Sequence, residues 1–166
     1  MSSSIYAAIP LMVLLAVVQT AVLPRFPILG LVPLLPFLIA LSWGLLRGIN
    51  EGILWAFIAG IFLDLFSIIP VGVSALAFMG GITAVLLIQQ ILPISQFLLP
   101  ALFAAVATLI YLLIYFVLLA IFGFGIDTVV ATSLLPLILL HAALNLPIYW
   151  VMRQINRATR PPRVEL

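Results

Sequence analysis

The sequence contains no cysteine, no lysine and a single histidine, His141, and only 6% of its residues are charged. The missing cysteine excludes disulfide bonds and thiolate chemistry. The missing lysine excludes a phosphate-binding P-loop and a lysine Schiff base. One histidine cannot supply a zinc site built from several histidines or the pair in an HExxH motif. The basic residues are all arginine and too few for a nucleic-acid-binding face, so we expect neither a cofactor nor a nucleic-acid partner.

Most residues of the sequence are apolar. The chain has 166 residues, and 67% of them are hydrophobic. A soluble domain has about 25% charged and about 45–50% apolar residues. This chain therefore has too little polar surface to cover a water-soluble globule, and its length suits one domain. The composition predicts an integral membrane protein.

The apolar residues group into six stretches, each near the length of a membrane-spanning helix. Such a helix needs about 20 residues, with a range of about 17–25. Backbone groups facing lipid must be satisfied within their own segment, so we predict helices. We expect Pro36 to kink the second one. The prediction is an all-α compact bundle of about six transmembrane helices in one domain, 1–166, with helices at 5–23, 28–46, 52–68, 72–90, 98–122 and 134–152.

The arginines predict the orientation of this bundle. With six spans both termini lie on one side, and that side carries five arginines while the other carries only Arg25. The positive-inside rule places both termini in the cytoplasm, with short loops and a basic cytoplasmic tail at 153–166. The residues before the first apolar stretch include no basic side chain, and the stretch is long for a signal peptide. We therefore expect it to remain as a membrane anchor.

Asp64 is the acid that most needs an explanation, because it falls within a predicted span. An acid at the bilayer centre costs about 2.5–3.5 kcal/mol, and less near the interface. The next helix begins just across a short turn, at Gly72-Val73-Ser74, and its free N–H groups and positive dipole end can receive the carboxylate. We favour this capping role, and contact with a partner is the alternative. A catalytic pair with Asp127, as in intramembrane aspartyl proteases, is a weaker hypothesis because the flanking residues match poorly.

Small residues recur every four positions along the third segment and are matched by glycines in the fourth. Small side chains allow helices to approach closely in lipid, where no hydrophobic force drives them together. We favour packing within one bundle over an interface with a partner, which stays open. The positions are Gly52, Ala56, Gly60 and Asp64 in the third segment, and Gly72, Gly80 and Gly81 in the fourth.

Polar and basic side chains gather on the last segment. His141 and Asn145 are four residues apart and share one helix face. They suit hydrogen bonding inside the bundle, or else a pocket or a partner helix. Beyond them, Arg153, Arg157 and Arg160 follow one face as the helix leaves the membrane. This arrangement favours anionic lipid head groups, although the arginines could equally serve only to set the topology.

One stretch also resembles a known family. It reads Gly52-x7-Gly60-Ile-Phe-Leu-Asp64-Leu-Phe-Ser67-x4-Gly72-Val-x-Ala75-Leu. This pattern resembles the rod shape-determining MreD family, which has a glycine-spaced helix, an Asp-Leu near its end, a short turn and then a Gly-Val or Gly-Leu. The proline-containing second span and the Asn-Leu-Pro to Met-Arg pattern at the end of the last helix are also similar to that family.

The resemblance implies a non-enzymatic scaffold in the bacterial inner membrane, with several spans. The MreD family belongs to the cell-wall elongation complex, which supports peptidoglycan synthesis and rod shape. MreC is the implied direct partner, and MreB, RodA and a class B penicillin-binding transpeptidase are indirect partners. The family is also similar to the substrate-binding subunits of energy-coupling-factor transporters, which is the alternative function. An intramembrane aspartyl hydrolase is the third and weakest hypothesis.

Overall fold

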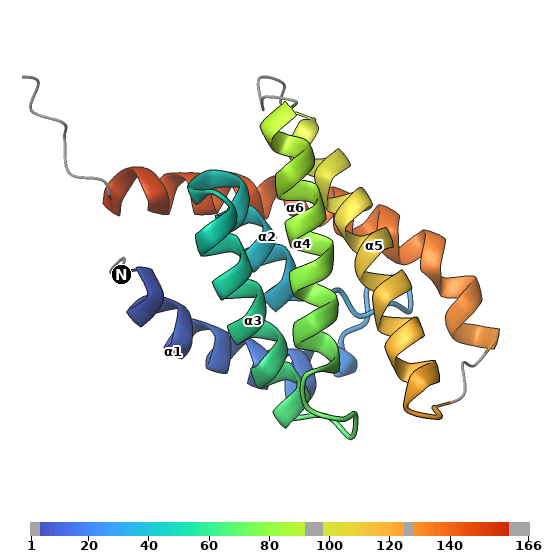
Figure 1. The fold of residues 1–166 in the computed structure, drawn as a ribbon. Helices are drawn as coiled ribbons and strands as arrows, with labels where there is room; N and C mark the ends of the chain where they lie inside the picture. Colours follow the sequence, from blue (N-terminus) through green and yellow to red (C-terminus); the bar gives the residue numbers. More distant parts are fainter. Residues whose placement is uncertain (1–3, 92–97, 125–127, 160–166) are drawn as a thin grey trace, which may run out of the picture.

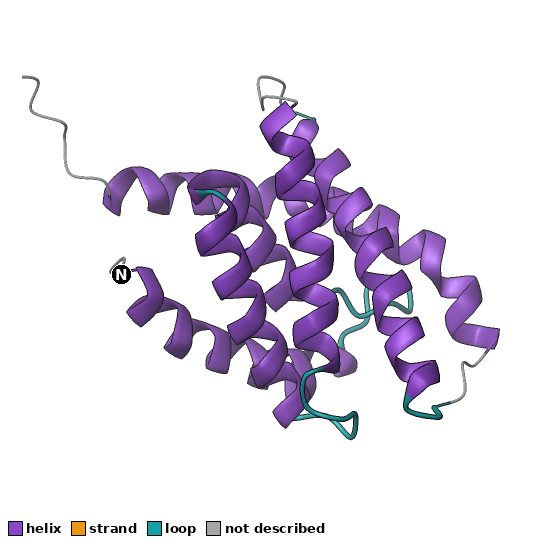
Figure 2. Ribbon diagram, in the orientation of Figure 1, coloured by secondary structure: helices purple, strands orange, loops and turns teal. Residues whose placement is uncertain are grey.

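The computed structural model describes residues 4–91, 98–124 and 128–159. Within these ranges the chain is almost entirely helical, which confirms the all-α part of the predicted fold class (Figure 2). Six α-helices pack side by side as one bundle (Figure 1). They are α1 (Ser4–Val17), α2 (Leu35–Arg47), α3 (Ile49–Leu65), α4 (Val73–Ile91), α5 (Leu99–Ile121) and α6 (Thr128–Thr159).

The first apolar stretch stays helical beyond the end of α1. A π-helical turn at Val18–Val22 and a 3-10 turn at Leu23–Arg25 continue it. The hydroxyl of Thr20 donates a hydrogen bond to the carbonyl of Ala16 at 2.9 Å. A π-turn adds one residue to the helical repeat and re-aims the side chains that follow. Gln19 lies in this turn, and its side chain is buried.

The second helix begins at Leu35, whereas the sequence predicted a start at residue 28. Pro36 lies in its first turn, where an N–H group has no partner within the helix, so this proline starts the helix and does not kink it. The helix ends at Arg47 because the next residue, Gly48, has a φ of 97° that stops the helical path, and α3 begins at Ile49. With 13 residues, α2 is about 20 Å long.

A tight hairpin precedes α2 and replaces its predicted first turns. Ile28 and Leu31 exchange two backbone hydrogen bonds, with N···O distances of 2.8 and 2.9 Å. The two residues between them both have positive φ angles, 53° at Leu29 and 78° at Gly30. These angles are those of a type I′ turn, which normally carries asparagine or glycine at both positions. The leucine at the tip is therefore in a conformation that its side chain disfavours.

The last helix is longer than predicted at both ends. The sequence predicted residues 134–152, with a loop before and a tail after, but α6 starts at Thr128 and continues to Thr159. Its 32 residues correspond to about 48 Å, against about 30 Å for the hydrocarbon core, so it must tilt or protrude. Pro136 and Pro147 lie inside it, and it bends as it passes behind the other helices (Figure 1). Residues 160–166 lie outside the described part.

The centre of the bundle is α2, which packs against α3, α4, α5 and α6. Most of its side chains are buried, including Phe37. The Phe37 ring lies 5.0 Å from that of Phe78 on α4 and 5.2 Å from that of Tyr111 on α5. Aromatic rings at such separations attract each other beyond the effect of area burial. This aromatic cluster joins three helices near the start of α2.

The length and hydropathy of four helical segments suit them to cross a membrane. They are Tyr6–Arg25, Val73–Ile91, Leu99–Ile121 and Leu134–Thr159. The other two helices, α2 and α3, are shorter, with 13 and 17 residues. Six full spans and the side on which the termini lie therefore stay predictions.

Candidate functional site

Asp64 lies at the end of α3 and is 1% exposed. Its Oδ2 accepts hydrogen bonds from the backbone N–H groups of Gly72 at 2.8 Å and Ser74 at 3.1 Å, and Oδ1 lies 3.2 Å from the Ser74 nitrogen. These N–H groups belong to the start of α4, where the helix dipole favours negative charge. The geometry is that of the capping role favoured from the sequence.

The chain reaches this cap through a turn that requires glycine. Gly72 has a φ of 105°, a region that side chains disfavour. A Cβ at Gly72 would meet no atom within 4 Å, so within the chain this glycine serves the turn conformation, and the packing or partner role expected for it stays a prediction. Asp127, the other half of the hypothetical catalytic pair, lies outside the described residues.

The closest contact in the small-residue ridge is between α3 and α4. A Cβ added to Gly60 would clash with the backbone of Ala75 and lie 2.8 Å from the carbonyl carbon of Ser74. Side chains of α4 could repack, but its backbone cannot move aside without shifting the helix. Gly60 therefore permits the approach that also brings Asp64 to the start of α4.

The other glycines of the ridge also face neighbouring helices of the same chain. A Cβ at Gly52 would lie 2.9 Å from the Cα of Gly44 on α2, and one at Gly81 would lie 2.7 Å from the carbonyl oxygen of Ala107 on α5. A Cβ at Gly80 would clash with Ile114. Ala56 is fully buried. These positions pack inside the bundle, and a role at a partner interface stays a prediction without a contact to support it.

His141 joins α6 to two other helices and is fully buried. Its Nε2 accepts a hydrogen bond from the backbone N–H of Leu34, just before α2, at 3.0 Å. Its Nδ1 lies 3.0 Å from the hydroxyl of Thr108 on α5. The Thr108 hydroxyl in turn donates to the carbonyl of Ala104 at 2.7 Å.

This chain of hydrogen bonds assigns the proton of the imidazole ring. Because Nε2 accepts from Leu34, the neutral ring carries its proton on Nδ1. That proton is donated to the hydroxyl oxygen of Thr108. The hydroxyl of Thr108 donates its own hydrogen to the backbone carbonyl of Ala104. Every donor then has one acceptor, and the histidine acts as a neutral hydrogen-bonding link between helices.

Asn145 lies one helical turn further along α6 and is also fully buried. Its Oδ1 accepts from the hydroxyl of Ser42 on α2 at 3.0 Å, and its Nδ2 donates to the carbonyl of Pro100 on α5 at 2.8 Å. The helix face that His141 and Asn145 were predicted to share thus contacts α2, or the residue just before it, and α5. Each of the two side chains bonds to both of these neighbours, one helical turn apart. Both side chains are bonded inside the bundle.

A third side chain completes the start of α2. The Oε1 of Gln19 accepts from the backbone N–H of Leu35 at 3.0 Å. The first N–H groups of a helix have no partner within it and are costly to leave unpaired in lipid. Gln19 and His141 satisfy two such groups, at Leu35 and Leu34. The buried polar cluster, defined as Gln19, Ser42, Thr108, His141 and Asn145, therefore positions a helix that starts inside the bundle.

The opposite end of α2 carries a second group of polar contacts. Trp43 Nε1 donates to Glu51 Oε2 at 2.9 Å, and the Trp43 ring stacks on that of Trp55 at 4.8 Å. The guanidinium of Arg47 lies 5.1 Å from the Trp43 ring centre and donates to the hydroxyl of Thr159 at 3.1 Å. These contacts hold the end of α6 against α2.

The arginines near the end of α6 point away from the bundle. Arg153 and Arg157 are exposed, although each follows a buried residue, Met152 or Asn156, and Arg160 lies outside the described residues. Their interaction with lipid head groups stays a prediction. Of the residues described, no three histidine or acidic side chains are grouped as a metal site would require.

Gln19, Ser42 and Thr108 were assigned no role from the sequence. These residues could have been found in the sequence, because a polar side chain within an apolar span is costly unless a partner satisfies its hydrogen bonds. Which groups they meet depends on how six helices pack, and helical periodicity within one segment carries no such information.

The apolar helices, tied together by buried polar side chains, define a helical membrane protein. The family model for the rod shape-determining protein MreD matches residues 1–158, almost the entire chain. The chain therefore belongs to the MreD family, as the sequence resemblance predicted. Neither the curated proteins nor the solved structures offer a match.

Proposed function

We propose that this rod shape-determining membrane protein is a non-enzymatic scaffold of the cell-wall elongation complex. It binds MreC directly in the bacterial inner membrane and through it supports MreB, RodA and a class B penicillin-binding transpeptidase. Membership of the MreD family supports this role. We further propose six spans with cytoplasmic termini, and contact of Arg153, Arg157 and Arg160 with anionic head groups.

The observation that carries this proposal is the way in which the buried polar groups are used. His141 and Asn145 bond to α2 and α5, and Asp64 bonds to the start of α4. Fully bonded polar networks rigidify a core and specify one arrangement. A rigid bundle with a fixed outer surface suits a protein that positions other membrane proteins.

Copurification from native membranes tests the proposal. A tagged version is expressed at its normal level in a bacterium that lacks its own copy, and the captured proteins are identified by mass spectrometry. We expect MreC to be enriched over membranes that carry an untagged version. Failure to enrich MreC while the cells regain rod shape would contradict direct binding.

The same experiment separates the alternative functions. A substrate-binding transporter subunit would be captured with an ATPase module and without MreC. An aspartyl hydrolase would be captured with neither, and its loss would cause an uncleaved membrane substrate to accumulate. Enrichment of MreC without an ATPase would favour the scaffold over both.

A further inference from the structure

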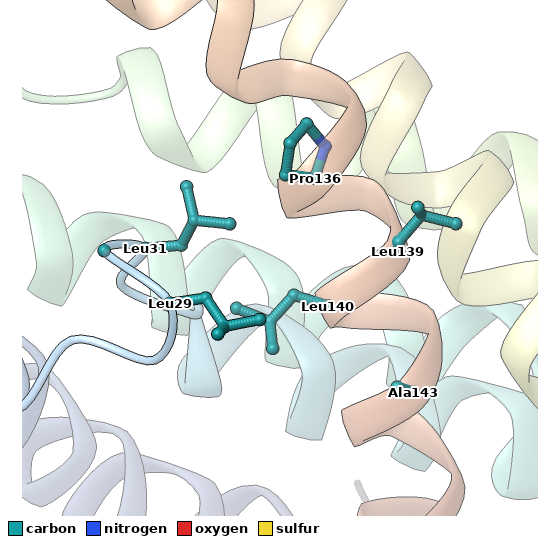
Figure 3. A pocket seen from close by; sticks show the side chains of 7 residues that line it. Leu29, Leu31, Pro136, Leu139, Leu140 and Ala143 are labelled. Carbon is teal, nitrogen blue, oxygen red and sulfur yellow. The ribbon is translucent and has the colours of Figure 1, made fainter.

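An apolar groove runs between the hairpin that precedes α2 and one face of α6. It has a volume of about 530 Å³, within the range of about 300–1,000 Å³ usual for ligand sites. The hairpin side chains of Leu29 and Leu31 face α6, with Leu29 and Leu140 directed toward each other (Figure 3). The lining side chains are Leu29, Leu31, Pro136, Leu139, Leu140 and Ala143.

The predicted position of the last span sets the depth of the groove in a bilayer. The sequence predicts this span at residues 134–152, so Ala143 lies nine residues, or about 14 Å, beyond its predicted start. Half of the hydrocarbon core is about 15 Å. The groove therefore extends from the membrane surface to near the bilayer centre, which is the region filled by the acyl chains of one leaflet.

Leu29, which forms the hairpin side of the groove, has a strained backbone conformation. Leu29 has a φ of 53°, and an L-residue in this left-handed region costs about 1–2 kcal/mol. Asparagine or glycine would avoid the cost, yet this position holds a leucine whose side chain is 93% exposed and lines the groove. Strain of this kind is concentrated at functional sites.

A positive charge lies shortly before the hairpin in the sequence. Arg25 ends the first candidate span and is exposed, and no acidic side chain among the described residues pairs with it. It precedes Leu29 by four residues, so the two Cα atoms are at most about 14 Å apart. A phosphate above the groove would meet this guanidinium, which binds phosphate oxygens well.

We propose that this groove binds an anionic phospholipid of the bilayer. One acyl chain lies between the hairpin and α6, and the phosphate contacts Arg25. The size of the groove favours an acyl chain over a partner helix, because a helix about 10–12 Å wide fills about 500 Å³ in a single turn. This lipid site goes beyond the proposed scaffold role and does not depend on MreC.

Photocrosslinking of lipid to the purified full-length protein tests the site. The probe is a phosphatidylglycerol with a diazirine near the end of one acyl chain, mixed with the matched phosphatidylcholine probe. We expect adducts to concentrate on the peptides that contain Leu29 and Leu139. Ala143→Phe should abolish most of this labelling because its ring fills the groove. Arg25→Gln should lower the preference for phosphatidylglycerol about fivefold while labelling persists.

Two further variants keep the test decisive. Leu113→Phe is a matched control, because Leu113 is a 59% exposed residue of α5 outside the groove, and it should label like the wild type. Leu29→Gly relieves the strained turn and removes one wall, so it should reduce labelling without threatening folding. Equal labelling in the wild type, Ala143→Phe and Leu29→Gly would overturn the proposal. Crosslinking of these residues to a protein and not to lipid in native membranes would also overturn it.

Discussion

At the scale of single residues, buried polar side chains act as caps for the starts of neighbouring helices. Asp64 receives the N–H groups of Gly72 and Ser74, while His141 and Gln19 receive those of Leu34 and Leu35. In lipid no water is present to bond these groups, so a side chain from elsewhere in the fold must do so. The cost of burying each polar residue is thereby offset by the backbone groups that it satisfies.

Substitution of Asp64 tests this capping role. Asp64→Ala leaves two buried N–H groups without an acceptor and should lower the free energy of unfolding by about 2 kcal/mol or more. Asp64→Asn keeps one acceptor oxygen for Gly72 and Ser74, so it should retain part of that stability and much of the rod-shape function. Unfolding in detergent and complementation of cell shape, scored beside the protein level, measure both effects.

The catalytic alternative makes a different prediction for the same variants. A general base cannot be replaced by an amide, so Asp64→Asn would then be as inactive as Asp64→Ala. Equal and complete loss of rod shape in both variants at normal protein level would contradict capping. Under the catalytic hypothesis, adding Asp127→Asn to either Asp64 variant would make the loss no worse.

The link between His141 and Thr108 gives a second prediction at this scale. A double-mutant cycle with His141→Leu and Thr108→Val should reveal a coupling free energy of about 0.6 kcal/mol and at most about 1.7 kcal/mol, the average and maximum for polar pairs between membrane helices. A matched cycle of His141→Leu with Ser42→Ala should show weaker coupling, because Ser42 bonds to Asn145. Strict additivity of His141→Leu and Thr108→Val would contradict the assigned hydrogen bond.

At the scale of the elements, the bundle depends on close approach at glycine. Gly60→Leu places a branched side chain against the backbone of Ala75, and we expect a loss of at least about 3 kcal/mol, because the helices must separate. Phe57→Leu is the matched control on the same helix, since Phe57 is 46% exposed. The melting temperatures of both variants in detergent measure the difference. A lower melting temperature for Phe57→Leu would contradict the position of the ridge.

The start of α2 shows that apolar patterns in the sequence predict helix boundaries less well than tertiary packing determines them. Residues 28–34 are apolar enough to extend a helix, yet they form a hairpin and an extended entry to α2. The Leu29 side chain is directed toward Leu140 of α6 across the groove (Figure 3) and stays 93% exposed, while His141 accepts a hydrogen bond from the N–H of Leu34. The start of α2 was therefore decided by contacts with residues more than a hundred positions away, which a local pattern does not contain.

At the scale of the whole molecule, the arginine distribution makes a topology prediction. The chain has no cysteine, so single cysteines can be introduced without a background. Ile68→Cys lies in the connection between α3 and α4 and is 97% exposed, while Ala158→Cys is exposed near the end of α6. In intact cells a membrane-impermeant maleimide should label Ile68→Cys, and Ala158→Cys only after permeabilisation. The reverse pattern would place the termini outside the cytoplasm.

The sequence by itself determined the class of the protein, its helices and its family. Charge content, apolar length and the Gly52–Leu76 pattern are properties of the chain that need no tertiary contact. The Asp64 cap could also be predicted, because Asp64 and Ser74 are only ten positions apart in the sequence. Local spacing was sufficient in each case.

Tertiary structure alone decided where α2 begins, how far α6 extends and which polar groups meet. The partners of His141 and Asn145 lie on α2 and α5, and the groove has one wall from the hairpin and the other from α6. Almost every segment of this sequence is apolar, so hydropathy cannot distinguish a lipid-facing side from a buried one. Only the close approach of small residues and the pairing of scattered polar groups select one arrangement of six similar helices, and both are properties of the packed bundle.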